Sequence, residues 1–375
     1  MKNIKFFSLI CFFSFFIFSC ATFNISAIDN NVSVDAREAL KFESVIKKAK
    51  KSVVILAVSP NEDPSLNREQ GAMCSGAVID DIGHVITNFH CVYKQNFIRL
   101  FYFDENDWQK YKVNIIGLDP LADLALLEVI GKEDPIPHLK FADDAGEIEE
   151  GTEVFALGHP MGMVWTTTKG IVSSNARYAR HPYIKSLQTD AAINKGNSGG
   201  PLLNMRGEIV GINALIISRI SENAGVAMAI RGDIVKKSFE SMLDNGKVDR
   251  PAVGVMITGL STIDNRDKLK KEFPDVDLKF IPNTFGLLIR PDENIPEGLE
   301  EFDTIIAVND RMTNDGLQFS DELSKYKIGD TITLTIIRKR RYMKVDVPLK
   351  VFPVPVEKLY GNGIRPQQNP KKVPE

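Results

Sequence analysis

The segment 196–201, Gly-Asn-Ser-Gly-Gly-Pro, constrains the fold of this chain more than any other stretch. Glycine accepts backbone dihedrals that side chains forbid, so this backbone can turn sharply and let a ligand come close. The pattern predicts that Ser198 is a nucleophile, with the N–H groups of Gly196 and Ser198 converging on the oxygen of an attacked carbonyl. A turn of this kind is catalytic only if a base and a carboxylate join it from elsewhere in the chain.

The length and net charge of the chain limit the number of domains and the class of partner. With 375 residues the chain is long enough for two folded domains with large cores. Its formal net charge of -3 gives no indication of nucleic-acid binding. The basic run 338–341 lies between two strand-like segments, which favours a solvated hairpin tip over a binding patch.

The N-terminus has the features of an export signal. Two lysines precede an apolar run at residues 6–18, which has the length of a signal-peptide core. We therefore assign residues 1–19 to a signal peptide and residues 20–40 to a polar tether. The run ends in Ile-Phe-Ser-Cys, similar to a relaxed bacterial lipobox, which favours acylation of Cys20 and a membrane-anchored lipoprotein. Ordinary cleavage after a small residue such as Ala27 is the alternative.

The cysteines of an exported chain suggest a disulfide. Of the four, one leaves with the signal peptide and Cys20 would carry lipid, so Cys74 and Cys91 remain as a candidate pair. Zinc is the alternative partner, but His84 and His90 show no paired metal-ligand spacing with them. We expect no metal and no other cofactor.

A histidine lies beside this pair. Residues 74–79 and 84–91 read as two strands of a hairpin, and we expect the second strand to deliver His90. A bond between Cys74 and Cys91 would close a loop of roughly sixteen residues, worth up to ~3 kcal/mol in the chain-entropy model. It would also fix the strand end that carries the imidazole, and small misplacements of a general base cost large factors in rate.

Two carboxylates compete for the third role, in the stretch 117–129. Asp119 precedes a proline, which favours a turn position. Asp123 directly opens an apolar strand, where it can be buried and still accept hydrogen bonds from a histidine. We favour Asp123.

The order His90, Asp123, Ser198, with Thr-Asn-Phe-His, Asp-Leu-Ala-Leu-Leu and Ala-Ala-Ile-Asn-Lys-Gly-Asn-Ser-Gly-Gly-Pro-Leu around them, resembles the chymotrypsin-like serine proteases. More narrowly, it resembles the HtrA (Deg) family of bacterial envelope proteases. The resemblance covers roughly residues 40–353. It implies a mostly β fold, with two six-stranded barrels and the active site in the cleft between them.

The resemblance also implies roles for single residues. His90 would be the general base, Asp123 its orienting carboxylate and Ser198 the nucleophile, with Gly196 and Ser198 as the oxyanion hole. One departure is Lys195, which stands where the family usually has proline and would loosen this loop.

A substrate pocket can be predicted in part. Ala192 would lie at its floor, and Gly211, Ile212 and Asn213 would line one wall. Ile193 is also predicted to bind substrate. No carboxylate is available there, so we expect cleavage after small or medium aliphatic residues rather than after lysine or arginine.

A second domain follows the first. We assign residues 41–243 to the protease domain and 244–250 to a linker. Residues 251–353 alternate in places and resemble a bacterial PDZ domain, a smaller α+β unit. Residues 354–375 have the composition of a disordered tail.

The PDZ resemblance implies binding of peptide C-termini, which such domains hold as an added strand. The carboxylate would lie on the backbone of Val253, Gly254 and Val255. Residues 261–283 depart from the family, being long and charged, so the groove is expected to differ.

Taken together, the sequence predicts an exported serine endopeptidase of the HtrA type in the bacterial envelope, with unfolded or signal proteins as substrates. The resemblance implies a homotrimer. The alternative is a PDZ-based chaperone or scaffold whose protease site is idle.

Overall fold

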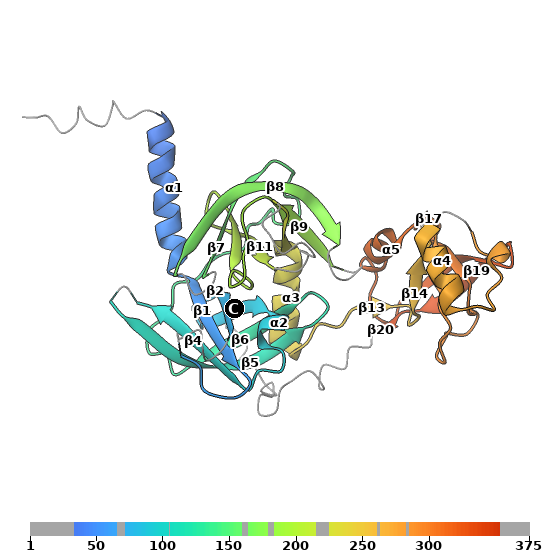
Figure 1. Cartoon of the computed structure of the whole chain (residues 1–375), viewed down its shortest axis with the longest axis horizontal. Coiled ribbons are helices and arrows are strands. Elements are labelled where there is room, and N and C mark those ends of the chain that lie inside the picture. The colour runs from blue at the N-terminus through green and yellow to red at the C-terminus, as the bar shows by residue number, and fades with distance from the viewer. Residues whose placement is uncertain are drawn as a thin grey trace, which may run out of the picture. The chain divides into compact units, whose positions relative to one another are not determined.

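The fold was obtained as a computed structural model, which describes residues 34–65, 72–104, 106–159, 164–178, 184–214, 225–260, 263–282 and 285–352 (Figure 1). The predicted signal peptide, Cys20 and the predicted tail lie outside these residues. Among the described helices, none combines the length and the apolar character that crossing a bilayer requires.

Helix α1 spans Val34–Lys50. It begins within residues 20–40, the stretch that we expected to be a polar tether. Alanine, arginine and glutamate occupy residues 36–38 and favour helix, which accounts for this start.

The first barrel closes six antiparallel strands in the order β1-β2-β3-β6-β5-β4. Successive residues of β1 face opposite sides: Val54 and Leu56 point into the main barrel core, and Ile55 and Ala57 into a second apolar cluster. Burial on both faces explains why this strand is apolar up to its last residue, Ser59. The strands are β1 Val53–Ser59, β2 Ala72–Val78, β3 His84–Asn88, β4 Phe97–Phe103, β5 Trp108–Asp119 and β6 Leu124–Ile130.

The second barrel closes another six strands in the order β10-β11-β12-β9-β8-β7. Val154, Leu187 and Leu202 lie in its core. The predicted pair of six-stranded barrels is thereby confirmed. The strands are β7 Glu153–Gly158, β8 Thr166–Tyr178, β9 Lys185–Thr189, β10 Pro201–Asn204, β11 Ile209–Asn213 and β12 Ala227–Arg231.

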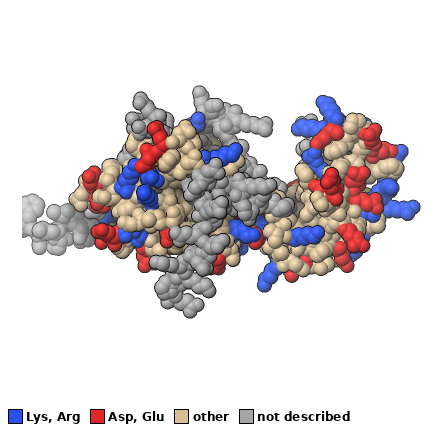
Figure 2. All heavy atoms as spheres, turned by 90° about the horizontal axis from the view of Figure 1, so that it is seen from below, with Lys and Arg blue, Asp and Glu red and all other residues tan. Residues whose placement is uncertain are grey.

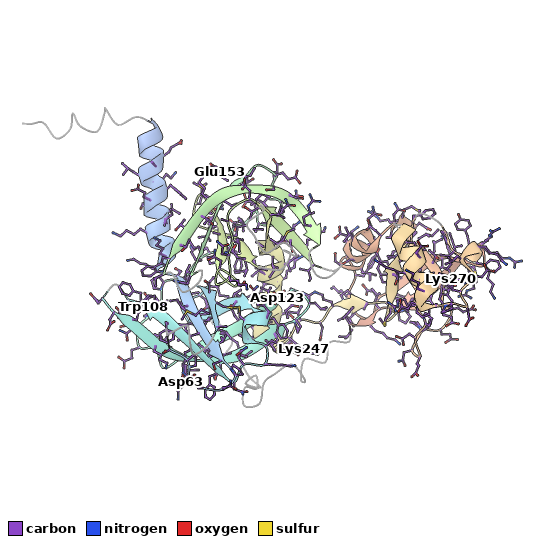
Figure 3. All side chains as sticks on the ribbon, in the orientation of Figure 1. Asp63, Trp108, Asp123, Glu153, Lys247 and Lys270 are labelled. Carbon is purple, nitrogen blue, oxygen red and sulfur yellow. A yellow bond between two sulfur atoms is a disulfide. The ribbon has the colours of Figure 1, made fainter. Side chains whose placement is uncertain are left out.

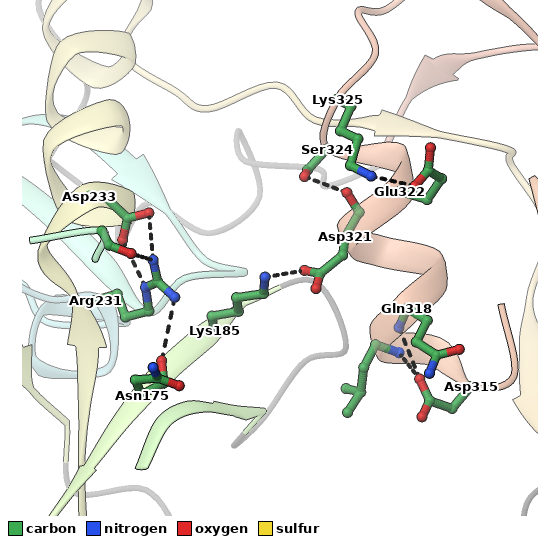
Figure 4. Close-up of polar contacts among 12 residues, drawn as sticks. Asn175, Lys185, Arg231, Asp233, Asp315, Gln318, Asp321, Glu322, Ser324 and Lys325 are labelled. Atoms are coloured by element: carbon green, nitrogen blue, oxygen red, sulfur yellow. Dashed lines mark hydrogen bonds and ion pairs between the residues drawn. The ribbon is translucent and has the colours of Figure 1, made fainter. Parts of the chain in front are cut away.

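Helix α3, Gly232–Asn245, follows the second barrel. Asp233 lies in its first turn, and Arg231 precedes the helix. The two side chains form an ion pair, with Arg231 Nε 3.0 Å from Asp233 Oδ1 (Figure 4). Gly246 ends the helix with a φ of 70°, the left-handed conformation that glycine adopts without strain.

The C-terminal region forms a smaller α+β domain around a sheet in the order β14-β15-β16-β18-β19. Asp315 caps helix α5 by accepting hydrogen bonds from the N–H groups of Leu317 and Gln318 (Figure 4). The elements are β13 Pro251–Ala252, β14 Ile257–Gly259, α4 Ile263–Glu272, the 3-10 helix η4 Leu278–Phe280, β15 Leu287–Ile289, β16 Thr304–Val308, β17 Arg311–Met312, α5 Gly316–Leu323, β18 Thr331–Arg338, β19 Arg341–Pro348 and β20 Lys350–Val351.

The basic run forms the tip of the β18–β19 hairpin. Lys339 and Arg340 make the turn, both with positive φ. Arg338 differs from the predicted solvated tip, because its guanidinium lies 2.7 Å from the buried Asp303. On the face shown in Figure 2, basic and acidic side chains are interspersed, in keeping with the balanced composition.

A buried ion pair joins the linker to the first barrel. Arg250 donates two hydrogen bonds to Asp119, at 2.7 and 2.5 Å, and Ser238 Oγ donates a third to the same carboxylate at 2.7 Å. The Asp119 side chain is fully buried and that of Arg250 is 16% exposed. A carboxylate in this position is stable only while its partners stay in place.

Arg250→Ala should therefore lower the free energy of unfolding by about 3–5 kcal/mol, because the Asp119 charge stays buried without its cation. Urea unfolding measures the effect. The control is Arg206→Ala, which removes a guanidinium whose ion pairs are exposed and should cost about 0.5 kcal/mol or less. Equal losses for the two variants would contradict the assignment.

His159 follows β7, and its side chain is fully buried. Trp165 N donates a hydrogen bond to its Nδ1 at 3.2 Å. Burial lowers the pKa of His159 to about 4, against an opposing effect of the Val53 backbone. The unfolded chain takes up this proton near pH 6.5, so the stability that the neutral ring contributes is complete above about pH 6.5 and is lost as pH falls toward about 4.

In His159→Asn the amide oxygen replaces Nδ1 as acceptor and nothing titrates. The loss of unfolding free energy between about pH 7 and about pH 4 should be about 3 kcal/mol smaller than in the wild type. Urea unfolding at both pH values tests this. His138→Asn, at an exposed position, controls for removal of an imidazole. An unchanged pH dependence in His159→Asn would disprove the assignment.

Candidate active site

His90 lies in the short helix α2, Phe89–Val92. We expected it at the end of a strand, but β3 ends at Asn88. The turn forms because Asp123 accepts its first N–H groups: Phe89 N donates to the Asp123 carbonyl at 3.0 Å, and His90 N donates to Asp123 Oδ1 at 2.9 Å. The backbone of α2 is thus fixed by the residue that its imidazole faces.

The imidazole contacts the same carboxylate. His90 Nδ1 lies 2.8 Å from Asp123 Oδ2; the Asp123 side chain is 4% exposed and that of His90 33%. Asp123 has a φ of 56°, a left-handed conformation that few residues other than glycine adopt and in which aspartate is enriched. This backbone geometry turns the carboxylate toward the imidazole; Figure 3 marks Asp123 near the junction of the two barrels.

Two other buried or partly buried carboxylates, Asp119 and Asp80, have partners other than His90. Asp119 is bound by Arg250 and Ser238, so Asp123 alone of the two candidates contacts His90. A second carboxylate and imidazole pair joins Asp80 to His84 Nδ1 at 2.5 Å in the β2–β3 turn. Burial raises the pKa of Asp80, but hydrogen bonds from the His84 side chain and backbone outweigh it, and the net pKa is lowered. This pair fixes the turn.

Cys74 and Cys91 are joined by a disulfide that connects β2 to α2, with their Cα atoms 6.2 Å apart. Cys91 Sγ lies 3.7 Å from His90 Nε2. These three residues form the one group of potential metal ligands found among the described residues. While the two sulfur atoms are bonded to each other, they are not available as thiolate ligands.

Ser198 lies in a tight turn and is 4% exposed. The preceding turn, 194–197, is closed by a hydrogen bond from Asn197 N to the Asn194 carbonyl at 3.0 Å, and Gly196 has a φ of 103°. This hydrogen bond and the positive φ at the third residue are typical of a type II turn. Among the residues that the structure describes, no recorded hydrogen bond uses the N–H of Gly196 or Ser198 as donor, or joins Ser198 Oγ to His90.

The predicted pocket residues occupy two segments. Ala192 is partly exposed, and its carbonyl accepts a hydrogen bond from Thr168 Oγ1 at 2.8 Å. The Ile193 side chain packs in the core of the second barrel. Gly211, Ile212 and Asn213 form the buried end of β11, where Asn213 Nδ2 donates to the Pro201 carbonyl at 3.1 Å.

In the C-terminal domain, Val253 is buried, whereas Gly254 is exposed with a φ of 81°. Val255 is partly buried and packs on the same core as Phe319 of α5. These residues lead into β14, the edge strand of the sheet.

One residue of the site was missed from the sequence. Ser75, fully buried in β2, donates a hydrogen bond from its backbone N to the Ser198 carbonyl at 2.8 Å. Cys74-Ser75-Gly76 reads only as part of a strand, and no spacing in the sequence relates it to Ser198. Its position beside Cys74 was the available signal.

Comparisons with known proteins agree with this architecture. A family model described as "Trypsin-like peptidase domain" matches residues 74–212, and one described as "PDZ domain" matches residues 263–349. Proteins named "Probable periplasmic serine endoprotease DegP-like" are similar to most of the chain. The protein of Chlamydia muridarum is 30% identical over 302 residues, covering 80% of this chain and 58% of the relative. That of Pseudomonas putida strain GB-1 is 34% identical over 291 residues, covering 76% and 57%.

Solved structures show the same fold. "HtrA-type protease AlgW with decapeptide" has a TM-score of 0.66 at 24% identity, covering 84% of this chain and 99% of that one. A serine endoprotease from Yersinia pestis has a TM-score of 0.60 at 25% identity, covering 83% and 98%. The chain spans less than two thirds of the curated relatives described above, yet it contains both matched domains in order. The chain thus belongs to the HtrA-type (DegP-like) family, in which a trypsin-like peptidase domain precedes a PDZ domain.

Proposed function

We propose that this protein is a serine endopeptidase in which Ser198 is the nucleophile, His90 the general base and Asp123 the orienting carboxylate. The observation that carries the proposal is the double hydrogen bond of Asp123 to the backbone and the ring of His90. The carboxylate fixes the tautomer in which Nδ1 is protonated, so that Nε2 can accept the proton of Ser198 Oγ. Catalytic hydrogen bonds are often long before substrate binds, which accommodates the missing contact between His90 and Ser198.

The reaction is acyl transfer. Ser198 Oγ attacks the scissile carbonyl while His90 takes its proton, and the imidazolium then protonates the leaving amine. Water repeats the sequence and releases the acyl group. The N–H groups of Gly196 and Ser198 are the proposed donors to the tetrahedral oxyanion, and the type II turn leaves both without a recorded acceptor among the described residues.

Pocket chemistry supports a preference for small or medium aliphatic side chains before the cleaved bond. Ala192 offers only a methyl group, and Gly211 and Ile212 carry no charge. Unfolded or signal proteins are the proposed substrates, because an extended segment is needed to lie between the two barrels.

The C-terminal domain is proposed to hold the C-terminus of a peptide. Strand β14 pairs with β15 on one side only and lies at the edge of the sheet, so a peptide can add as a further strand. Residues 253–255 would receive the carboxylate. A Cβ atom added to Gly254 would meet nothing within 4 Å, which supports an open loop at this position.

Export to the periplasm is proposed from the relatives' names and from the N-terminal sequence. Acylation of Cys20 would anchor the protein to a membrane. The homotrimer is proposed from the family resemblance alone.

Ser198→Ala should abolish proteolysis. Loss of a nucleophile lowers kcat by about 10³-fold or more, and labelling by a fluorophosphonate should vanish with it. Peptides released from an unfolded model protein, identified by mass spectrometry, report activity and pocket preference together. The control is Ser173→Ala, which removes the hydroxyl of another serine in the same barrel. A Ser198→Ala protein that still cleaves would disprove the proposal, and a wild type that cleaves nothing would favour the chaperone or scaffold alternative.

Replacement of both Cys74 and Cys91 by serine should lower stability by about 3 kcal/mol and kcat by about tenfold, because α2 loses its covalent link to β2. Thermal unfolding and steady-state kinetics measure the two effects. Wild-type protein treated with dithiothreitol should lose the same activity and regain it on reoxidation. Activity that stays unchanged after reduction has released the two thiols would show that the bond does not position His90.

A further inference from the structure

Ser75 connects the two barrels through both its backbone and its side chain. Its N donates to the Ser198 carbonyl at 2.8 Å, and its Oγ donates to the Gly196 carbonyl at 2.7 Å. The same Oγ accepts a hydrogen bond from His159 N at 3.0 Å. A serine hydroxyl can donate one hydrogen bond and accept another through the same oxygen atom.

Glycines surround Ser75 at the positions where another residue's Cβ would collide with it. A Cβ atom added to Gly158 would lie 2.9 Å from Ser75 Oγ, one on Gly199 would lie 2.3 Å from the Ser75 carbonyl oxygen, and one on Gly200 would lie 3.1 Å from Ser75 Cβ. Thr87 Oγ1 donates to that carbonyl oxygen at 2.8 Å. Three glycines of the second barrel thus allow a close approach to one residue of the first.

Two of these contacts hold the segment that carries the proposed oxyanion donors. The peptide group between Gly196 and Asn197 is bound at both ends: its N–H donates to the Asn194 carbonyl and its carbonyl accepts from Ser75 Oγ. One residue further on, the Ser198 carbonyl accepts from Ser75 N. These bonds restrict rotation on both sides of the nucleophile.

Ser75 also adjoins the link to the base. Cys74, its neighbour in β2, is bonded to Cys91, which follows His90. Ser75 therefore holds the turn that carries Ser198, and its neighbour Cys74 holds the helix that carries His90.

We propose that Ser75 is a positioning residue, whose hydroxyl fixes the oxyanion turn of the second barrel relative to the His90 helix of the first. This inference rests on the proposed function of Ser198, His90 and Gly196. Ser75 does not touch substrate. It acts by holding the Gly196 carbonyl, and with it the orientation of the two N–H donors.

Ser75→Ala is the first test in the full chain, since it removes the hydroxyl and keeps both backbone bonds. We expect kcat to fall about 10- to 100-fold, because misplacement of catalytic groups by about 1 Å costs such factors, while KM changes less than about threefold. Ser75→Thr retains the hydroxyl and should keep kcat within about tenfold of the wild type. Ser59→Ala is the matched control, because Ser59 is also buried in the first barrel and its Oγ accepts N–H bonds from residues 61 and 62.

A second measurement separates positioning from general stability. Proline at position 195, the second residue of the type II turn, would preset its φ and favour the same turn without Ser75. Lys195→Pro should raise the kcat of Ser75→Ala by at least about threefold, and that of the wild type by less. If Ser75 only stabilised the fold, Lys195→Pro would not restore the kcat of Ser75→Ala.

The outcomes are distinct. Ser75→Ala with the kcat of the wild type, or a kcat loss equal to that of Ser59→Ala, would overturn the proposal. If Ser75→Ala does not fold, a kcat of Ser75→Thr more than about 100-fold below the wild type would overturn it, and a value within tenfold would support it. Ser198→Ala run in parallel tests the proposed function itself: if that variant stays active, the function fails; if it is inactive and Ser75→Ala is not impaired, only the role of Ser75 fails.

Discussion

The site depends on how closely the two barrels approach each other. His90 and Asp123 belong to the first barrel and Ser198 to the second, so their relative positions are set by contacts across the junction. Those contacts include hydrogen bonds from Ser75 N to the Ser198 carbonyl and from Ser75 Oγ to the Gly196 carbonyl. A Cβ atom on Gly199 would lie 2.3 Å from the Ser75 carbonyl oxygen, so the glycines after the serine serve packing as well as the turn.

A second constraint is electrostatic. The turn between β5 and β6 contains two carboxylates four residues apart, both nearly inaccessible to water. Each needs its own partners, since a buried charge without them is costly. Asp119 is compensated by Arg250 of the linker, which leaves Asp123 to the imidazole. The division of partners lets a short turn hold one structural and one proposed catalytic carboxylate.

The two barrels were predicted through the family resemblance, and the candidate triad through local patterns such as glycines around a serine and an aspartate that opens a strand. The sequence did not reveal the details that distant contacts set. His90 lies in a helix because Asp123, far along the chain, accepts the first N–H groups of that turn. The role of Ser75 was missed because its partners come from the other barrel, and its position beside Cys74 was the only indication in the sequence.

The described residues 263–282 of the charged stretch supply apolar side chains to a small separate core, which also includes Leu288 of β15. Leu287 and Ile289, on the opposite face of the same strand, pack with Phe319 of α5 in the main core. Because successive strand residues face opposite sides, residues 263–282 pack on one face of the sheet and α5 on the other. The charged composition of the stretch did not indicate this apolar packing.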